Sequence, residues 1–362
     1  MNNTPITQTD QGRILSVDFF RGFTMFLLVA NFGQLFDPGS PNPVVVFFAG
    51  QFDHVNWSGL AFWDLIQPFF MFIVGVSMPY SFEKRRTRGD SWNKTLMSAL
   101  KRSLILLFLG WVISSTPTYS TFTNVLAQLS VTYFIAFLVM RWQIKWQLLV
   151  SFALIIFSDL IFRYWPVAGF VQPFTADHNF GSWLDVWLTG SVSEDRWVAF
   201  NAIPTTAHTI WGVVGGLILM KPWSANKKIQ TLFLAGIVGV IAGYALGIYI
   251  PIIKRVCTSS FIIVSGGWAL IALAFSYWLI DIKNFRRTGF FFAVVGMNPL
   301  FIYLFTHSGG NDMLRGFINP VIYRIFAWTS KDTIVTIEVL LISAMLWYIC
   351  YFLYKRKIFI RI

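Results

Sequence analysis

Apolar residues follow one another along this chain in long runs, and short polar connections, many of them basic, separate the runs. The runs are about 18 to 25 residues long, the length that a helix needs to cross a hydrocarbon core of ~30 Å. They predict spans at residues 14–36, 59–82, 96–115, 124–140, 146–163, 204–220, 229–251, 258–280, 289–306 and 333–354. The pattern therefore predicts an all-α fold, a polytopic transmembrane helical bundle of about ten spans, with residues 1–362 forming a single domain.

Two segments do not fit the pattern of spanning runs. Residues 311–328 are amphipathic, and Gly316 and Pro320 interrupt them, so we expect a segment that is interfacial or re-entrant rather than spanning. Residues 1–12 form a polar N-terminal tail without a basic n-region or a cleavage site. We therefore expect the first span itself to act as the insertion signal.

The composition agrees with a membrane protein. Hydrophobic residues make up 56% of the chain and charged residues only 12%, whereas soluble domains carry about 25% charged residues. The net charge of +12 does not indicate a nucleic-acid partner, because the basic residues form short clusters between spans. We therefore expect membrane lipids around the protein and no nucleic acid as a partner.

The distribution of Lys and Arg predicts the orientation of the bundle. Most of them, including those in EKRRTRG after the second span and in the terminal KRKIFIR, fall on one side of the predicted membrane. The positive-inside rule makes that side cytoplasmic. Both termini are then cytoplasmic, and the connections 37–58 and 164–203 face outward. With no luminal domain or sorting tail recognised, we expect a bacterial cytoplasmic membrane.

Polar side chains inside the first predicted span are candidate functional residues, because an ionisable group there costs about 2.5 kcal/mol or more. Asp18 and Arg21 lie three residues apart on one helical face, so they can form a pair that locks the helix into the bundle. Arg21 could instead meet an anionic ligand from the cytoplasm. Asn31, near the outer end, suits either an interhelical hydrogen bond or a donor to a developing oxyanion.

Later spans add further polar residues. Asp64 and Gln67 lie about one turn inside the second predicted span. The remaining intramembrane polar residues are Gln128, His208, Asn298 and His307. For a lone histidine such as His208, hydrogen-bonded packing is the simpler interpretation. The small residues of GVVGG near residue 215 indicate close packing between helices rather than phosphate binding.

The segment DHVNWSG, residues 53–59, combines several residue types that support chemistry. His54 adjoins Asp53, and Asp64 follows in the next span. An imidazole can move a proton near neutral pH or act as a nucleophile; a loop histidine without chemistry is the alternative. The four histidines show no HxxxH spacing and no cysteine pair, and no GxSxG is present, so neither a metal site nor a serine hydrolase is predicted.

Several stretches together resemble a known family. They are RILSVDFFRGFTMFLLVANFG, HVNWSGLAFWDLIQPFFMFIVGVS, VLAQLSVTYF, IPIIKRVCTSSF, YWLIDIK and VGMNPLFIYLFTH. The chain resembles the membrane domain of heparan-α-glucosaminide N-acetyltransferases and their bacterial relatives. This resemblance implies an acetyl-CoA-dependent acyltransferase that passes an acetyl group from the cytoplasm to the amine of an amino sugar or glycan outside.

The resemblance also implies roles for particular residues. His54 matches the catalytic histidine of H-x-x-W-x-G, acting as general base or as transient acetyl carrier, and Asn31 matches a second active-site asparagine. We expect Asp64 to complete the catalytic set. The expected contacts to the donor acetyl-CoA are Arg21, Gln128, Asn298 and His307. Asp53 and Trp57 are expected on the acceptor side, although Asp53 could instead orient the His54 ring or simply solvate the loop.

Two other functions remain compatible with the residues. One is a transporter or flippase of a sugar or lipid-linked substrate, whose polar side chains would line a path rather than perform chemistry. The other is a relative that has lost catalysis and serves in envelope assembly. Family members often form dimers, so a homodimer is an expected assembly. The identity of the acceptor is not defined by the sequence.

Overall fold

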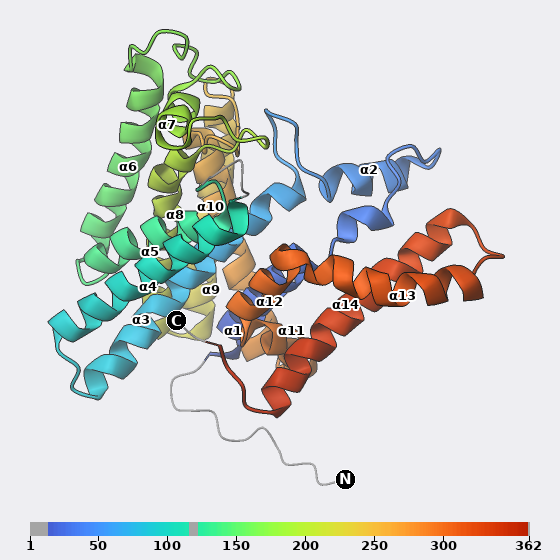
Figure 1. Cartoon of the computed structure of the whole chain (residues 1–362). Coiled ribbons are helices and arrows are strands. Elements are labelled where there is room, and N and C mark those ends of the chain that lie inside the picture. The colour runs from blue at the N-terminus through green and yellow to red at the C-terminus, as the bar shows by residue number, and fades with distance from the viewer. Residues whose placement is uncertain (1–13, 116–121, 361–362) are drawn as a thin grey trace.

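A computed structural model describes residues 14–115 and 122–360, and within these it consists of helices and their connections, without strands (Figure 1). The predicted tail 1–12 lies outside the described residues. The α-helices are α1 Leu15–Val29, α2 Pro43–Gln51, α3 Ile66–Thr87, α4 Trp92–Ser114, α5 Val125–Val139, α6 Ile144–Tyr164, α7 Phe180–Thr189, α8 Ala202–Met220, α9 Ala225–Gly247, α10 Ser259–Tyr277, α11 Arg286–Gly296, α12 Pro299–Phe305, α13 Asn311–Ile325 and α14 Lys331–Lys355. The short 3₁₀ helices η1 Phe32–Leu35, η2 Phe62–Leu65 and η3 Ala199–Asn201 precede or follow them.

The prediction of an all-helical membrane protein is confirmed at this level. Within the described residues, seven helices are long and apolar enough to cross a membrane, or eight if the bent pair of α11 with α12 and α13 counts as one span. α1 and α5 correspond to predicted spans but have only 15 residues each. The number of ten spans and the cytoplasmic position of the termini therefore stay predictions.

α3 and α8 form the centre of the bundle, and glycines let their backbones approach each other. A methyl group on Gly75 would collide with the backbone at Thr209, and one on Gly212 would collide with the backbone at Phe72. Gly216 meets Val76 in the same way. The small-residue packing predicted for GVVGG is therefore confirmed.

The ninth predicted span, 289–306, is broken rather than continuous. α11 ends at Gly296, and the axis of α12 with α13 is bent by 61° from that of α11. At the break, the buried Asn298 side chain donates to the Ile358 carbonyl at 3.0 Å and accepts from the Ile360 amide at 2.9 Å. The amide thus holds the segment after α14 against the gap between the two helices.

The predicted outward connections contain helices that the sequence pattern did not reveal. α2 begins where the Asn42 side chain accepts from the Val44 amide and Pro43 occupies the first turn. α7 begins in the same way at Asn179 and ends at Gly190, whose φ of 83° lies in the left-handed region. Capping residues created these helices in segments too short or too polar for a spanning pattern.

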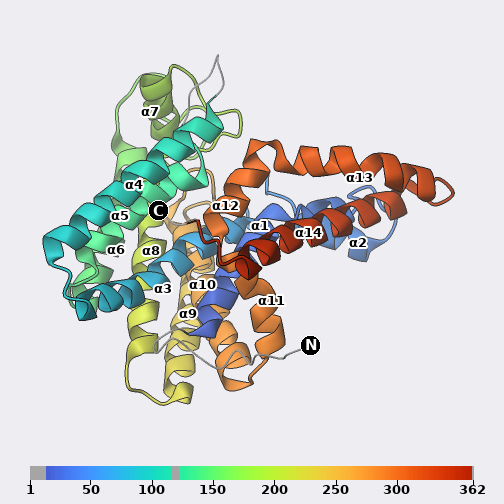
Figure 2. The ribbon, with the colours of Figure 1, turned by 60° about the horizontal axis from the view of Figure 1, so that its bottom comes forward.

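α2, α13 and the first half of α14 extend sideways from the rest of the helices, in a projection that we call the arm (Figures 1 and 2). α13 covers all but the last three residues of the segment 311–328, and it packs against α14 through an ion pair of 3.0 Å between Arg315 and Glu338. α13 and α14 thus form a helical hairpin. The interfacial or re-entrant position of this segment in a membrane stays a prediction.

Candidate active site

Residues 53–59 are held in place by two contacts with distant parts of the chain and by one contact with the nearby Asp64. The Trp57 indole donates to the Phe174 carbonyl at 2.7 Å, and the Gly59 amide donates to the Ile252 carbonyl at 2.8 Å. Gly59 has φ of 133°, a conformation that residues with a Cβ rarely adopt. The Val55 amide also faces Asp64 Oδ2 at 3.4 Å. His54 therefore stands on a well-supported turn that joins three connections at one end of the bundle.

His54 and Asp64 form the hydrogen bond at the centre of this site. His54 Nδ1 lies 2.8 Å from Asp64 Oδ1, and Asp64 Oδ2 accepts from the Ala61 amide at 3.1 Å. The Asp64 side chain is only 2% exposed, whereas the His54 side chain is 45% exposed. A buried carboxylate thus holds the inner edge of a ring whose other edge reaches water, the arrangement that orients a general base or nucleophile.

Lys254 is a third member of this group, and the sequence analysis missed it. Its Nζ lies 3.1 Å from His54 Nδ1 and 3.4 Å from Asp64 Oδ1, and its side chain is 14% exposed. Burial lowers the pKa of Lys254 from its ordinary value, and the Asp64 carboxylate opposes this shift. Two hundred residues separate the lysine from the histidine, so only the family-like stretch IPIIKRVCTSSF could have pointed to it.

Asn31 lies apart from this group, at the end of α1. Its φ of 50° lies in the left-handed region, so the first helix stops there instead of continuing to residue 36 as predicted. Among the described residues, no hydrogen bond joins the Asn31 side chain to His54. Asn31 instead lines a cavity of about 1000 Å³ between η1 and the three helices of the arm, α2, α13 and α14.

Asp53 lines the same cavity as Asn31. Its Oδ1 accepts from the His54 backbone amide at 2.7 Å, so it supports the turn rather than the imidazole. The charged residues around the cavity are Asp37, Asp53, Asp332, Glu338, Arg315 and Lys331. Carboxylates outnumber cations in this lining, and the cavity lies beside the segment that carries His54.

Two of the predicted acetyl-CoA contacts, Arg21 and Gln128, lie on different helices. The prediction that Asp18 and Arg21 pair is confirmed, with 3.6 Å between them, and Arg21 Nη2 donates to Ser77 Oγ at 2.5 Å. Gln128 Nε2 donates to Asn201 Oδ1 at 2.8 Å and faces Thr205 Oγ1 at 3.1 Å. The Gln128 amide is therefore engaged in a buried network, whereas Arg21 is partly exposed.

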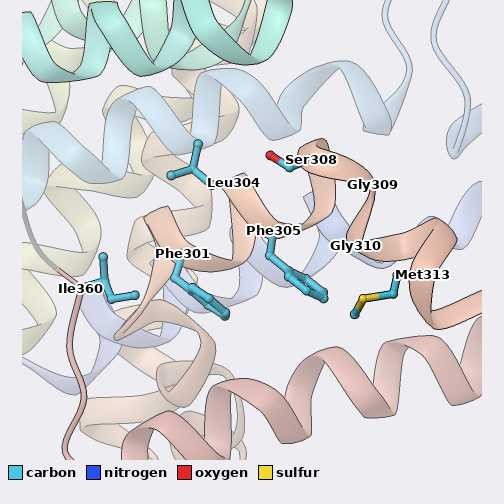
Figure 3. Close-up of a pocket in the computed structure, with 8 residues that line it drawn as sticks. All are labelled: Phe301, Leu304, Phe305, Ser308, Gly309, Gly310, Met313 and Ile360. Carbon is cyan, nitrogen blue, oxygen red and sulfur yellow. The ribbon is translucent and has the colours of Figure 1, made fainter.

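The other two, Asn298 and His307, lie at opposite ends of α12, Asn298 at the break before it and His307 just after it. Asn298 binds the segment after α14, as described above, and the exposed His307 ring stacks on Tyr303 with 4.0 Å between ring centroids. An apolar pocket of about 400 Å³ lies beside α12. Figure 3 shows that three of the side chains that line it, those of Phe301, Phe305 and Met313, point downward in this view. None of its eight lining residues is charged, so it offers no cationic partner for a phosphate.

His208 and the two cysteines are buried packing residues. His208 Nε2 lies 2.9 Å from Ser265 Oγ and 3.1 Å from the Ile262 carbonyl, which confirms the packing interpretation. Cys257 and Cys350 are free and buried. No three His, Cys, Asp or Glu side chains gather as metal ligands in residues 14–115 and 122–360.

The fold and this site define a helical membrane protein with a histidine–carboxylate–lysine group at one end of its bundle. Residues 13–252 match the family described as heparan-alpha-glucosaminide N-acetyltransferase, catalytic, and the chain belongs to this family. It is similar to heparan-alpha-glucosaminide N-acetyltransferase from Mus musculus (25% identical over 98% of this chain) and from Homo sapiens (24% over 97%). The match covers 61% and 60% of those relatives, so the chain spans about three fifths of their length.

Proposed function

We propose that this protein is a transmembrane acetyltransferase that moves an acetyl group from cytoplasmic acetyl-CoA to an amine on the other side of the membrane. The acceptor class is an amino sugar or a glycan that carries one, in keeping with the names of the relatives. The observation that carries the proposal is the His54–Asp64 hydrogen bond, in which a buried carboxylate orients a half-exposed imidazole within the matched family segment.

His54 acts through Nε2 in this proposal. When Nδ1–H donates to Asp64, the lone pair of the ring lies on Nε2, on the edge of the ring away from the carboxylate. The acceptor nitrogen attacks the thioester carbonyl carbon, the C–N bond forms, the C–S bond breaks and the amine proton passes to Nε2. In the alternative route, Nε2 takes the acetyl group first and the amine then attacks the acetyl-imidazole.

Asn31 and the large cavity have supporting roles in this scheme. Asn31 is proposed to donate from its amide to the thioester oxygen as negative charge develops there. The cavity that Asn31 and Asp53 share is proposed to admit the acceptor, whose protonated amine suits a lining in which carboxylates outnumber cations. Trp57 supports the acceptor side through the turn that it anchors.

On the donor side, Arg21 is the strongest candidate for a phosphate contact. It is a guanidinium near the predicted cytoplasmic end of α1, and its side chain is 23% exposed. Gln128 and Asn298 have their amides bound within the protein, so they are proposed to shape the donor path rather than to bind the nucleotide. His307 is proposed to line the same path with an exposed ring.

The central test uses purified protein in detergent with radiolabelled acetyl-CoA, with and without glucosamine. We expect acceptor-dependent release of coenzyme A that is lost in His54→Ala. The matched control is His178→Ala, which removes an exposed histidine whose Nδ1 lies 3.4 Å from the Gly169 carbonyl. Unchanged turnover in His54→Ala would remove the assigned role. Label retained on the wild-type protein, but not on His54→Ala, would favour the acetyl-imidazole route.

The side of the membrane on which His54 lies has a separate test, in a bacterial cytoplasmic membrane. Ser58 is exposed on the turn that carries His54, and both native cysteines are buried, so Ser58→Cys gives a single reactive thiol. We expect an impermeant thiol reagent to label it from outside intact spheroplasts. Labelling only after lysis would reverse the orientation and contradict transfer from a cytoplasmic donor to an outer acceptor.

A further inference from the structure

Lys254 contacts both members of the His54–Asp64 pair, and the reaction scheme above does not use it. The lysine approaches the same ring nitrogen, Nδ1, that faces Asp64. A ring nitrogen either donates or accepts, so Nδ1 cannot donate to Asp64 and accept from the Lys254 ammonium at the same time. The position of one proton on His54 is therefore set by two oppositely charged neighbours.

The electrostatic effect of Lys254 follows from these distances. A buried carboxylate 2.8 Å from an imidazole favours the protonated, cationic ring. An imidazolium has no lone pair on Nε2, so it serves neither as a general base nor as a nucleophile. An ammonium group 3.1 Å from the ring opposes that protonation, and it balances the Asp64 charge through the contact of 3.4 Å.

The backbone around Lys254 is built to hold this position. The Lys254 carbonyl accepts from both the amide and the thiol of Cys257, each at 3.0 Å, and Cys257 has a left-handed φ of 54°. Thr258 Oγ1 accepts from the Ile253 amide at 3.0 Å and donates to the Pro251 carbonyl at 2.9 Å. The connection between α9 and α10 is thus a closed turn, which limits the movement of the lysine.

We propose that Lys254 is a positioning residue for His54: its ammonium group balances the buried Asp64 carboxylate and so opposes a second proton on the imidazole, while Asp64 accepts from Nδ1–H and leaves the lone pair on Nε2. The consequence for catalysis rests on the proposed acetyltransferase function, whereas the charge state of the ring does not. Lys254 itself need not touch the acetyl donor or the acceptor.

Few other charged groups face this pair. The Arg255 guanidinium donates to the Asp195 carbonyl, and the Cys257 thiol stays neutral because burial raises its pKa to about 12. Asp53 is exposed and accepts from the His54 backbone amide. The titratable and charged groups next to the ring and its two partners are Asp53, Asp64, Lys254, Arg255 and Cys257. On the connection that contacts Arg255, the charged residues Glu194, Asp195 and Arg196 are exposed.

The first test measures the protonation of the His54 ring without any turnover. Protein labelled with ¹³C-histidine is titrated by NMR in detergent, and the His54 signal is the one missing from His54→Gln. We expect Lys254→Met to move the titration midpoint to higher pH by about one unit or more. Lys254→Arg keeps the charge and should stay close to wild type. Arg255→Met, which removes a neighbouring cation, is the control and should give a smaller shift.

A second pair of variants keeps the test valid if Lys254→Met fails to fold. Asp64→Asn leaves the ammonium beside the ring, so the midpoint should move to lower pH, and adding Lys254→Met to it should raise the midpoint again. No difference between Asp64→Asn and the double variant would overturn the proposal. An unchanged midpoint in folded Lys254→Met would do the same.

Activity separates this inference from the proposed function. If transfer occurs, the acid limb of the pH–rate profile should move with the NMR midpoint in Lys254→Met, and turnover above that limb should be affected less. Activity in wild type with no shift in either measurement would leave the acetyltransferase standing and remove the role of Lys254. A midpoint shift without any acetyl transfer would leave Lys254 as stated and remove the function.

Discussion

Two polar clusters lie side by side at the start of α3, and they differ in charge and in access to water. Asp64 belongs to an ionised group that includes the half-exposed His54. Gln67, three residues later, belongs to a neutral one, in which its Nε2 donates to Gln128 Oε1 at 2.5 Å and Gln128 continues to Asn201. The neutral amides bond to one another inside the bundle, whereas the ionised groups lie at its end, where His54 reaches water.

The two clusters are connected, so the neutral one also supports the ionised one. Gln128 contacts Thr205, the Thr205 hydroxyl donates to Cys257 Sγ at 3.2 Å, and the Cys257 thiol donates to the Lys254 carbonyl. The chain of hydrogen bonds runs from the interior of the bundle to the backbone of Lys254. Only the ionised cluster contains the ring proposed to react. Changes in that cluster should therefore affect catalysis, whereas changes in the neutral cluster should mainly affect stability.

The largest effect is expected from Asp64→Ala. Without the carboxylate, the inner edge of the His54 ring faces only the Lys254 ammonium, which cannot accept from Nδ1–H. Proton transfer of this kind is worth about 100-fold or more in rate. We expect the initial rate of coenzyme A release to fall by at least that factor. Asp177→Ala is the matched control, because it removes a partly exposed carboxylate whose partner is Arg196 at 3.5 Å, and it should stay within a few-fold of wild type. Equal losses in both variants would contradict the assignment.

The neutral cluster is tested by Gln128→Leu. This change leaves Gln67 and Asn201 without their partner, and a buried polar group left unpaired costs about 1–3 kcal/mol in the free energy of unfolding. We expect a lower melting temperature in detergent, followed by tryptophan fluorescence, with most of the activity per folded molecule retained. Gln143→Leu, at an exposed glutamine, should leave the melting temperature nearly unchanged. Loss of activity without loss of stability would instead favour a donor contact for Gln128.

Asn298→Ala tests a third buried amide, which binds the segment after α14. Removing it leaves the Ile360 amide without its acceptor, so the segment should detach more often, at a cost of about 1 kcal/mol. Hydrogen exchange at the Ile360 amide should be several-fold faster than in wild type. Asn284→Ala, at an exposed asparagine, is the control. Protection that survives Asn298→Ala would show that other contacts hold the segment.

The smallest effect concerns Asp185 on α7, a carboxyl that is buried in the structure. Burial raises its pKa to about 7, and the Ala199 amide, which donates to it at 3.0 Å, opposes this shift. Between about pH 4 and 7 the folded protein binds a proton that the unfolded chain has released, so stability falls as pH rises through this window.

Asp185→Asn keeps the acceptor for Ala199 and removes the titration. The melting temperature of the variant, relative to wild type, should therefore rise from pH 6 to pH 7, by an amount equivalent to about 1 kcal/mol. A constant difference across this range would show that Asp185 does not titrate with folding.

The sequence predicted the helical membrane fold because long apolar runs leave few other structures open to a chain. It did not predict where helices stop, since Asn31 ends α1 through its own backbone conformation and Asn298 interrupts the ninth run. α2 and α7 escaped prediction because their caps lie in connections without a spanning pattern.

The site was predicted in part, for the same kind of reason. His54 and Asp64 are ten residues apart, so their meeting could be anticipated from one segment and its span. Lys254 lies 200 residues from His54, and no periodicity relates the two. Asn31 and His54 lie apart because residues 37–51, which include α2, make an excursion away from the bundle between them. The path of this connection depends on its packing.

That excursion leaves and returns at one place, where the rings of Phe36 and Phe52 stack with 5.3 Å between their centroids. The aromatic pair closes its base, so the residues beyond can change in length or composition while Asn31 and His54 keep their supports. α2 is in this sense an exchangeable segment. A protein engineer could exchange it to test which acceptors the proposed acetyltransferase uses, while the His54–Asp64–Lys254 group stays unchanged.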